Sequence, residues 1–263
     1  MNGAWTVVGR VARLGRYPVK SLQGETLDRA ELTTLGIPGD RALGVVDVDT
    51  GRVLSAKSVP QLLDAEARTT GSGVEVRVPG DSWSEAPSPA LDAAISAWLG
   101  HAVRVEPPPP VDEDARSFTL SMNMDDQSAD RFDWPCPSGT FFDLAAVHVL
   151  TTASIRAAQR LYPAGAWQVD RFRPTVLVDA AGDGFVDDAW VGGRLRFGTV
   201  EISVDLPTMR CIMTTRPQRG LARDLGIVKT VNQHHEGNLG LYCSMVSPGQ
   251  VAVGDEVSFL PVP

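Results

Sequence analysis

The chain has 263 residues, of which 43% are apolar and 21% charged, with a formal net charge of -8 and a pI near 5.0. This acidic balance disfavours sequence-independent nucleic-acid binding, which needs a surplus of Lys and Arg to neutralise phosphates. The apolar content is sufficient for a full hydrophobic core, so we expect one large domain or two small ones.

The cysteines Cys136, Cys211 and Cys243 are far apart and form no C-x-x-C pair. Their spacing indicates neither a disulfide framework nor a zinc or iron-sulfur cluster, and it is typical of a reducing compartment. The N-terminus lacks an apolar run long enough for a signal peptide, and no segment approaches the roughly 20 apolar residues of a membrane span. The sequence therefore predicts a cytoplasmic protein without a membrane or nucleic-acid partner.

The first half of the chain is predicted to be mostly strand. Apolar alternation and turn residues indicate strands at about 5–14, 25–33, 42–47, 53–56, 62–69, 74–78 and 103–106. Between Ser88 and Leu99 the period changes to that of an amphipathic helix, with Pro89 in its first turn and Gly100 after its last. Residues 107–114 are proline-rich and acidic, so we place a domain boundary there, between 1–110 and 111–263.

The second half is predicted to combine strands with one helix. Residues 115–140 have little regular pattern and are interpreted as a long loop, either functional or mobile. An N-cap signal predicts a helix from about Thr152 to Arg160. Strands are predicted at about 175–179, 193–197, 200–206, 239–246, 250–253 and 257–260, whereas 219–231 has no clean pattern. Many short strands and few helices predict a mainly β, α+β protein built on a barrel.

The best candidate for chemistry is Cys211, which lies in the run Pro207–Thr215. Cysteine acts as a nucleophile or a metal ligand in its thiolate form, and an adjacent guanidinium, here Arg210, favours that form. The alternative is a small buried cysteine beside a surface arginine, because free cysteine is among the most buried residue types.

Several cations and hydroxyls are predicted at strand ends. Arg171 and Arg173 lie at the entrance of an apolar strand, which suits an anionic ligand. Lys20 and Ser21 are predicted on a turn, and Arg41 at the mouth of another strand.

The hydroxyls of Thr151 and Thr152, with the first amides of the helix that follows, are a candidate phosphate site. The alternative is that they only cap the helix. The adjacent His234 and His235 lie in a polar stretch, 232–238, and are expected to be solvated rather than to bind metal.

Six motifs, in this order along the chain, resemble the MOSC superfamily with its N-terminal β-barrel domain. They are Tyr17-Pro18-Val19-Lys20-Ser21, Gly39-Asp40-Arg41, Ser55-Ala56-Lys57, Phe172-Arg173-Pro174, Arg210-Cys211-Ile212-Met213-Thr214-Thr215 and Gly249-Gln250-Val251-Ala252-Val253-Gly254-Asp255. The resemblance extends from about Val8 to Leu260, and the architecture is similar to that of the mitochondrial amidoxime reducing component and its bacterial counterparts. It implies an N-terminal barrel-like domain, 1–110, packed on a MOSC β-barrel, 111–263, with a few short helices.

The resemblance also implies a cofactor, the molybdenum cofactor (Mo-molybdopterin), with Cys211 as both the metal ligand and the catalytic residue. By the same resemblance the cofactor-binding residues are Lys20, Ser21, Arg41, Arg173 and Tyr242, and Arg171, Arg210, Thr151 and Thr152 are added as further candidates. Such a cofactor carries a phosphate and two thiolates, so cations and hydroxyls from distant loops have to converge on it.

The function implied is an oxidoreductase that reduces N-hydroxylated small molecules. Because no cysteine-rich ferredoxin domain follows the last strand, we expect a separate electron-donor protein that carries a flavin, a heme or an iron-sulfur cluster. Two alternatives are a non-catalytic cofactor carrier and a sulfur-transfer protein with a persulfide on Cys211. The chain departs from the family pattern at Thr175, where Asn is common, and at Met209, where a small polar residue is common, which indicates altered cofactor affinity or substrate choice.

Overall fold

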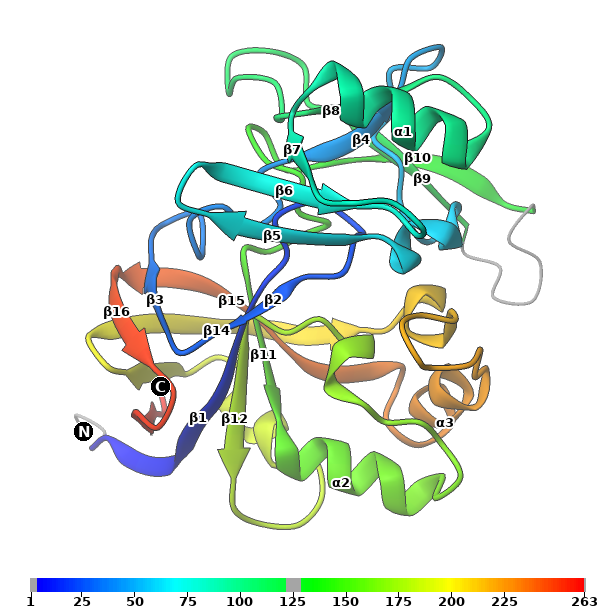
Figure 1. Cartoon of the computed structure of the whole chain (residues 1–263). Coiled ribbons are helices and arrows are strands. Elements are labelled where there is room, and N and C mark those ends of the chain that lie inside the picture. The colour runs from blue at the N-terminus through cyan, green and yellow to red at the C-terminus, as the bar shows by residue number, and fades with distance from the viewer. Residues whose placement is uncertain (1–3, 122–128, 263) are drawn as a thin grey trace.

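The structure is a computed structural model that describes residues 4–121 and 129–262 (Figure 1). It is mainly β, as predicted, and forms two lobes. The strands are β1 (Thr6–Arg16), β2 (Glu25–Leu27), β3 (Arg29–Leu32), β4 (Gly44–Asp47), β5 (Glu66–Thr70), β6 (Gly73–Arg77), β7 (Ser84–Ala86), β8 (Val103–Glu106), β9 (Ser117–Ser121), β10 (Arg131–Pro135), β11 (Val147–Thr151), β12 (Val176–Ala180), β13 (Arg194–Phe197), β14 (Val200–Met209), β15 (Asn238–Ser247), β16 (Gly249–Ala252) and β17 (Glu256–Leu260). The α-helices of the described part are α1 (Pro89–Leu99), α2 (Thr152–Leu161) and α3 (Gly226–His234).

The lower lobe in Figure 1 is a closed barrel. Its strands follow the order β12-β11-β15-β14-β13-β17-β1, and β1 closes the ring by pairing with β12 as well as with β17. Residues from both ends of the chain, such as Val11 and Val257, are buried in one core with residues between them, such as Leu195. Burial of this apolar surface is the main force that holds the barrel together.

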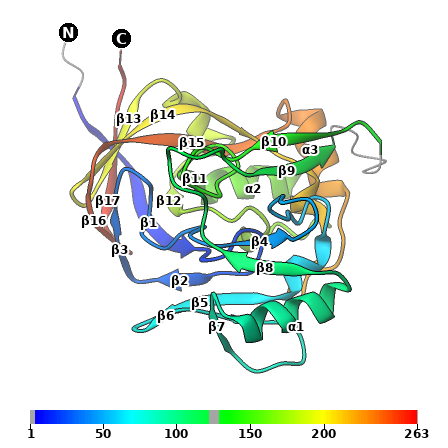
Figure 2. The same ribbon diagram turned by 90° about the horizontal axis from the view of Figure 1, so that it is seen from above.

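The upper lobe contains the pair β4–β8, the three-stranded sheet β5-β6-β7 and helix α1. Seen from above, α1 covers this lobe on the side away from the barrel (Figure 2). Leu91 and Ile95 of α1 pack with Leu62 and Val105 in a second hydrophobic core. Because β1 belongs to the barrel although it lies in the first 110 residues, the chain crosses between the lobes early. The division into 1–110 and 111–263 stays a prediction.

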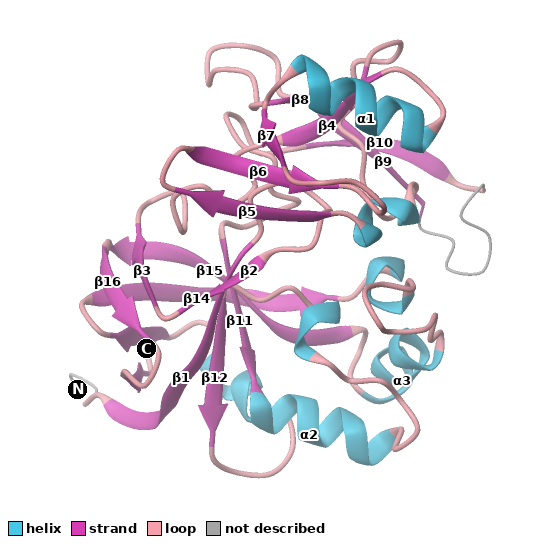
Figure 3. Ribbon diagram, viewed as in Figure 1, coloured by secondary structure: helices cyan, strands magenta, loops and turns pink. Residues whose placement is uncertain are grey.

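Two predicted helices are confirmed together with their caps (Figure 3). Helix α1 begins after Ser88, whose hydroxyl accepts a hydrogen bond from the Leu91 amide (3.2 Å), and it ends at Gly100 with φ +81°. A left-handed residue at this point satisfies the last carbonyls, and glycine adopts it without strain. Helix α2 begins after Thr151, whose hydroxyl accepts from the Ser154 amide (3.1 Å).

The structure corrects the prediction in four segments. Residues 53–56 form only an isolated bridge, Val46 to Val53, and Pro60–Asp64 is a 3-10 turn where a strand was expected to begin. The loop predicted over 115–140 contains the hairpin β9–β10, while 122–128 lie outside the described residues. Helix α3 occupies part of the stretch for which no pattern was found. It was not predicted because it buries only a short apolar stripe and Leu225, at its start, gives no capping hydrogen bond.

No helix in the described residues is long and apolar enough to cross a membrane.

We expect Leu14→Ala in β1 to lower the free energy of unfolding by about 2 to 5 kcal/mol, because Leu14 is fully buried where β1 pairs with both β12 and β2. The matched control is Val7→Ala, since Val7 lies on the same strand and is exposed. Equal shifts of the denaturant midpoint in the two variants would show that closure by β1 does not anchor the barrel.

Candidate functional site

A cavity of about 110 Å³ gathers eight of the ten predicted site residues, which come from segments far apart in the sequence. They are Lys20, Ser21, Arg41, Arg171, Arg173, Arg210, Cys211 and Tyr242. Lys20 and Ser21 follow β1, Cys211 follows β14, and Tyr242 belongs to β15. The barrel strands therefore deliver these side chains to one place.

Backbone strain is concentrated at this cavity. Ser21, Arg41 and Arg173 have φ of +69°, +48° and +52°, in the left-handed region that non-glycine residues rarely adopt. Such conformations cost of order 1 to 3 kcal/mol each and persist only where the surroundings hold them, which is common at functional sites. All three of these residues line the cavity, so the strained backbone conformation is found where their polar side chains are needed.

Cys211 is a free, partly exposed thiol in an extended conformation (φ -108°), directly before the 3-10 turn Ile212–Thr215. The hydroxyls of Thr214 and Thr215 donate to the carbonyls of Cys211 (3.1 Å) and Ile212 (2.7 Å). These hydroxyls therefore fix the turn that presents the thiol.

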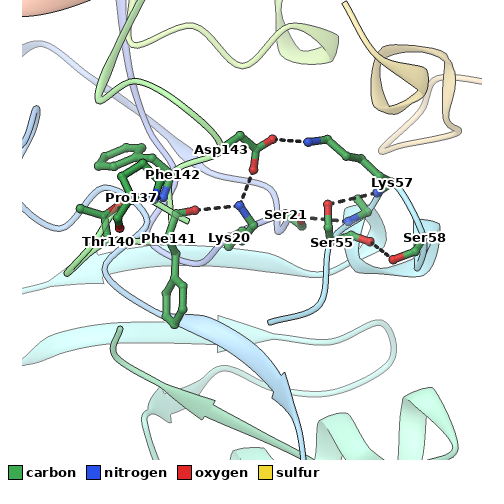
Figure 4. Close-up of polar contacts among 11 residues, drawn as sticks. Lys20, Ser21, Ser55, Lys57, Ser58, Pro137, Thr140, Phe141, Phe142 and Asp143 are labelled. Carbon is green, nitrogen blue, oxygen red and sulfur yellow. Dashed lines mark hydrogen bonds and ion pairs between the residues drawn. The ribbon is translucent and has the colours of Figure 1, made fainter. Parts of the chain in front are cut away.

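Asp143 bridges two buried lysines (Figure 4). One carboxylate oxygen accepts a short hydrogen bond from Lys20, and the other accepts from Lys57 at 2.7 Å; these lysines are 3% and 7% exposed. Lys20 also donates to the Phe141 carbonyl at 2.8 Å. The three charges hold segments of both lobes together.

The charge of Asp143 is stabilised by these partners. Burial alone acts to raise its pKa, but Lys20 and Lys57 more than offset this and hold the pKa far below its ordinary range. Burial likewise acts to lower the pKa of Lys57, yet the charge of Asp143 and then the nearby Cys211 raise it overall. Lys57 therefore stays charged at neutral pH.

Arg173 carries a donor without a partner. Its Nη1 donates to the Leu22 carbonyl at 2.6 Å, and its guanidinium carbon lies 4.0 Å from the centroid of the Tyr17 ring. Its Nη2 is buried and has no hydrogen-bond partner among the residues that the structure describes. Burial, followed by the nearby Arg41, lowers the pKa of Arg173 to about 10, so the charge persists. A buried unsatisfied guanidinium is costly, which indicates a site that accepts an anion.

Arg210 contacts a histidine that the sequence analysis did not single out. Its Nε donates to the Leu239 carbonyl at 2.7 Å, and Nη2 lies against Nε2 of His148. Burial lowers the pKa of Arg210 to about 10. Burial, then Arg210, lowers the pKa of His148 well below its ordinary value. His148 is therefore neutral, and because Nε2 accepts from the arginine, its proton lies on Nδ1.

Arg171 lines the cavity, but its guanidinium donates hydrogen bonds to backbone carbonyls. Four carbonyls accept from it, at distances of 2.7 to 3.2 Å: those of Ala166, Thr214, Arg216 and Ala222. Arg171 therefore fixes the segment that follows Cys211.

The structure does not bring Thr151 and Thr152 to the cavity. Thr151 is fully buried and donates to Asp187 (3.1 Å), while Thr152 donates to Asp179 (2.7 Å). Two carboxylates next to these hydroxyls disfavour a phosphate there. Of the two readings of this segment, the structure shows the helix cap.

His234 and His235 also lie outside the cavity. The expectation of solvated histidines is wrong for His235, whose ring stacks on Phe185 with centroids 3.6 Å apart. Its Nε2 lies 2.8 Å from the Asp188 carboxylate, and its Nδ1 lies 2.6 Å from the Asn238 carbonyl.

Four cavity or near-cavity residues were missed as site residues: Lys57, Asp143, His148 and Thr175. Lys57 belongs to a quoted motif and could have been included on that ground. Asp143 had no local signal, because its two lysine partners are 123 and 86 residues away. Thr175, one of the two departures from the family pattern, accepts a hydrogen bond from the His148 amide (3.1 Å), and Met209, the other, is 68% exposed at the cavity.

Two family models match this chain along most of its length. The MOSC N-terminal beta barrel domain matches residues 8–119, and the MOSC domain matches residues 138–258. The chain belongs to the MOSC domain proteins.

This MOSC protein is similar to curated relatives. It is 25% identical over 283 residues to mitochondrial amidoxime reducing component 2 of Bos taurus, with 95% of this chain and 83% of the relative covered. It is 24% identical over 293 residues to mitochondrial amidoxime-reducing component 1 of Homo sapiens, with 96% and 83% covered. Among solved structures, the YUAD protein from Bacillus subtilis aligns over 99% of this chain and 100% of that one, with a TM-score of 0.51 and 14% identity, a likeness of fold alone.

We expect Asp143→Asn to make the stability of the MOSC protein less dependent on pH in acid. The depressed pKa means that the carboxylate contributes stability above its unfolded pKa of about 3.9, and that this contribution is lost as pH falls toward the folded value. The slope lost is at most about 1.4 kcal/mol per pH unit, and solvent screening reduces it because the side chain is 37% exposed.

The measurement is urea unfolding between pH 3 and 7. Asp183→Asn is the matched control, since the Asp183 side chain is 95% exposed and its loss leaves the two lysines paired. Parallel stability curves for Asp143→Asn and the unsubstituted protein would contradict the assignment.

Proposed function

We propose that this MOSC protein is a molybdenum-cofactor oxidoreductase that reduces N-hydroxylated substrates, with Cys211 as the thiolate ligand to molybdenum. The observation that carries the proposal is the convergence of one accessible thiol with buried cations in a single cavity. The similarity to amidoxime reducing components, at 24% to 25% identity, supports the substrate class.

The residues present fit an anionic metal-pterin. Five cations line the cavity, Lys20, Arg41, Arg171, Arg173 and Arg210, with one carboxylate, Asp143. Lys57 pairs with Asp143, and Asp40 pairs with Arg41. The balance is positive, and the free Nη2 of Arg173 is a donor for a phosphate or another anionic group. Within the described residues no group of three or more His, Cys, Asp or Glu side chains could hold a metal ion alone. One protein thiolate is the ligand set expected for a metal whose other ligands come from an organic cofactor.

When bound, the cofactor supplies two-electron chemistry in which the N–O bond of the substrate breaks and two electrons and two protons are consumed, with the oxygen leaving as water. The chain's own residues hold that cofactor and control protons around it. Burial raises the pKa of Tyr242, so its hydroxyl stays protonated and can donate a hydrogen bond into the cavity. Neutral His148, with the Leu239 carbonyl, fixes the side chain of Arg210, the residue directly before Cys211.

The electrons have to come from outside the cavity. We propose a separate donor protein that carries a flavin, a heme or an iron-sulfur cluster, because Cys136 and Cys243 are buried and apart from Cys211, so that the chain's cysteines do not assemble a cluster.

We expect Cys211→Ser to lower molybdenum content about tenfold and to abolish reduction of an N-hydroxylated amidine, because a hydroxyl is a far weaker ligand than a thiolate. Metal analysis of the purified protein and a chemically reduced turnover assay measure the two effects. Cys136→Ala is the matched control, since the Cys136 thiol is buried in a hydrophobic cluster with Val46 and Phe118 and does not line the cavity.

Three outcomes of the same experiment speak against the proposal. Full molybdenum content and full turnover in Cys211→Ser exclude a role as metal ligand. Tightly bound cofactor in the unsubstituted protein without turnover under any reductant favours a cofactor carrier. A persulfide mass increment on Cys211 favours sulfur transfer.

We expect Arg173→Met to reduce bound pterin about tenfold and Arg173→Lys to reduce it less, since lysine keeps the charge but loses the planar set of donors. Fluorescence of the oxidised pterin released from the protein measures the content. Arg52→Met is the control, because Arg52 forms a partly exposed ion pair with Asp133 away from the cavity. Unchanged pterin in Arg173→Met would remove this residue from the cofactor site.

A further inference from the structure

A second cavity, which we call the side groove, adjoins the Cys211 cavity and has a volume of about 460 Å³. Phe142, Leu144, Ala145 and Tyr242 line both cavities. A molecule in the side groove can therefore reach the Cys211 cavity without leaving the protein surface.

The walls of the side groove are largely apolar. Strands β14 and β15 contribute Leu206 and Met245, the neighbouring strand β11 contributes Val147, and residues outside the strands contribute Leu35 and Leu144. Leu35, Leu144 and Leu206 are all exposed. Contiguous exposed apolar side chains around a cavity are typical of a binding site for the apolar part of a small molecule.

A β-bulge places one acidic residue in this wall. In the β14–β15 ladder Val204 pairs with Cys243 and Leu206 pairs with Tyr242, so that Asp205 has no partner opposite. A bulge redirects the extra side chain, and bulges are frequent next to functional sites. The Ser244 hydroxyl donates to the Asp205 carboxylate at 2.5 Å, which fixes its orientation.

The charge of Asp205 is not compensated by the protein. Asp205 is the sole charged residue among those lining the side groove, and it belongs to no ion pair in the described part of the chain. The Cys211 cavity, in contrast, holds an excess of cations. The Cys211 cavity is thus positively charged, and the adjoining side groove carries one negative charge. This difference suits a molecule that reacts in the Cys211 cavity and has a positive group at its other end.

We propose that the side groove binds the body of the substrate and that Asp205 selects N-hydroxylated bases whose apolar linker ends in a positive charge. This inference rests on the proposed function, because it takes the N-hydroxy group to react in the Cys211 cavity. Asp205 is the neighbour of Leu206, which pairs with Tyr242, and Tyr242 lines both cavities. Because Asp205 lies next to this junction, a short apolar linker, such as one aromatic ring, is the length that the test below uses.

The test compares three N-hydroxybenzamidines that carry an aminomethyl, a methyl or a carboxylate group at position 4. The cofactor-loaded protein is assayed with reduced methyl viologen as the electron source. We expect kcat/KM for the aminomethyl compound to exceed that for the methyl compound about fivefold, through KM, with the carboxylate compound the poorest. Asp205→Asn should bring the aminomethyl and methyl compounds to within about twofold, and Asp183→Asn should leave the preference unchanged.

Binding of the unhydroxylated products gives a readout that does not depend on turnover. Calorimetry should show tighter binding of 4-(aminomethyl)benzamidine than of 4-methylbenzamidine, and Asp205→Asn should remove the difference. A preference that survives in Asp205→Asn overturns the inference while the proposed function stands. A fall in pterin content in Asp205→Asn also overturns it, because the side groove would then hold the cofactor. If none of the three compounds is reduced, the proposed function fails and calorimetry alone decides the inference.

Discussion

The burial of several cations in one place is the constraint on which the rest of the structure depends. A buried charge is tolerated only where hydrogen bonds or a counter-charge replace its water. Lys20 donates to Phe141, Arg173 to Leu22 and Arg210 to Leu239, and in each case the acceptor is a backbone carbonyl. These carbonyls come from segments distant in sequence, so the satisfied cations also lock the loops of the cavity against one another.

Barrel closure and local strain act together to place these cations. Strand β1 completes the barrel and then passes directly into the turn with Lys20 and Ser21, so the lysine is fixed relative to β12 and β17. The Ser21 hydroxyl accepts from the Ala56 amide (3.0 Å), which ties the turn to the segment that carries Lys57. The apolar core of the barrel thereby supports a backbone that is unfavourable in isolation.

Much of the fold was predictable because its signals are local. Period-two alternation found most of the strands, and caps at Ser88 and Thr151 marked two helices. Helix α3 was missed because its apolar stripe is short and its start lacks a cap. The site was predicted mainly by the motifs that resemble the family, since Cys211 alone leaves a structural and a chemical reading open.

Electrostatic information was the part of the site that the sequence could not supply. Asp143 is an ordinary residue in the sequence, and only the fold brings two lysines to it. The same holds for His148, whose neutrality follows from burial beside Arg210 rather than from its own neighbours in the chain. Thr151 and Thr152 illustrate the opposite case. Hydroxyls at the start of a helix suit a phosphate, but the fold places the carboxylates of Asp187 and Asp179 within hydrogen-bond distance of them.

The distribution of charge differs between the Cys211 cavity and the adjoining side groove, so each suits a different kind of ligand. The Cys211 cavity has more cations than carboxylates and so attracts an anionic group, while the adjoining side groove is apolar with a single carboxylate. Tyr242 lies at the junction and lines both. Its protonated hydroxyl adds no charge to either side, so the boundary between them is set by the surrounding charges. An anionic cofactor in the Cys211 cavity and a cationic substrate in the side groove would therefore lie next to each other. A reaction between a cofactor and a substrate requires this arrangement.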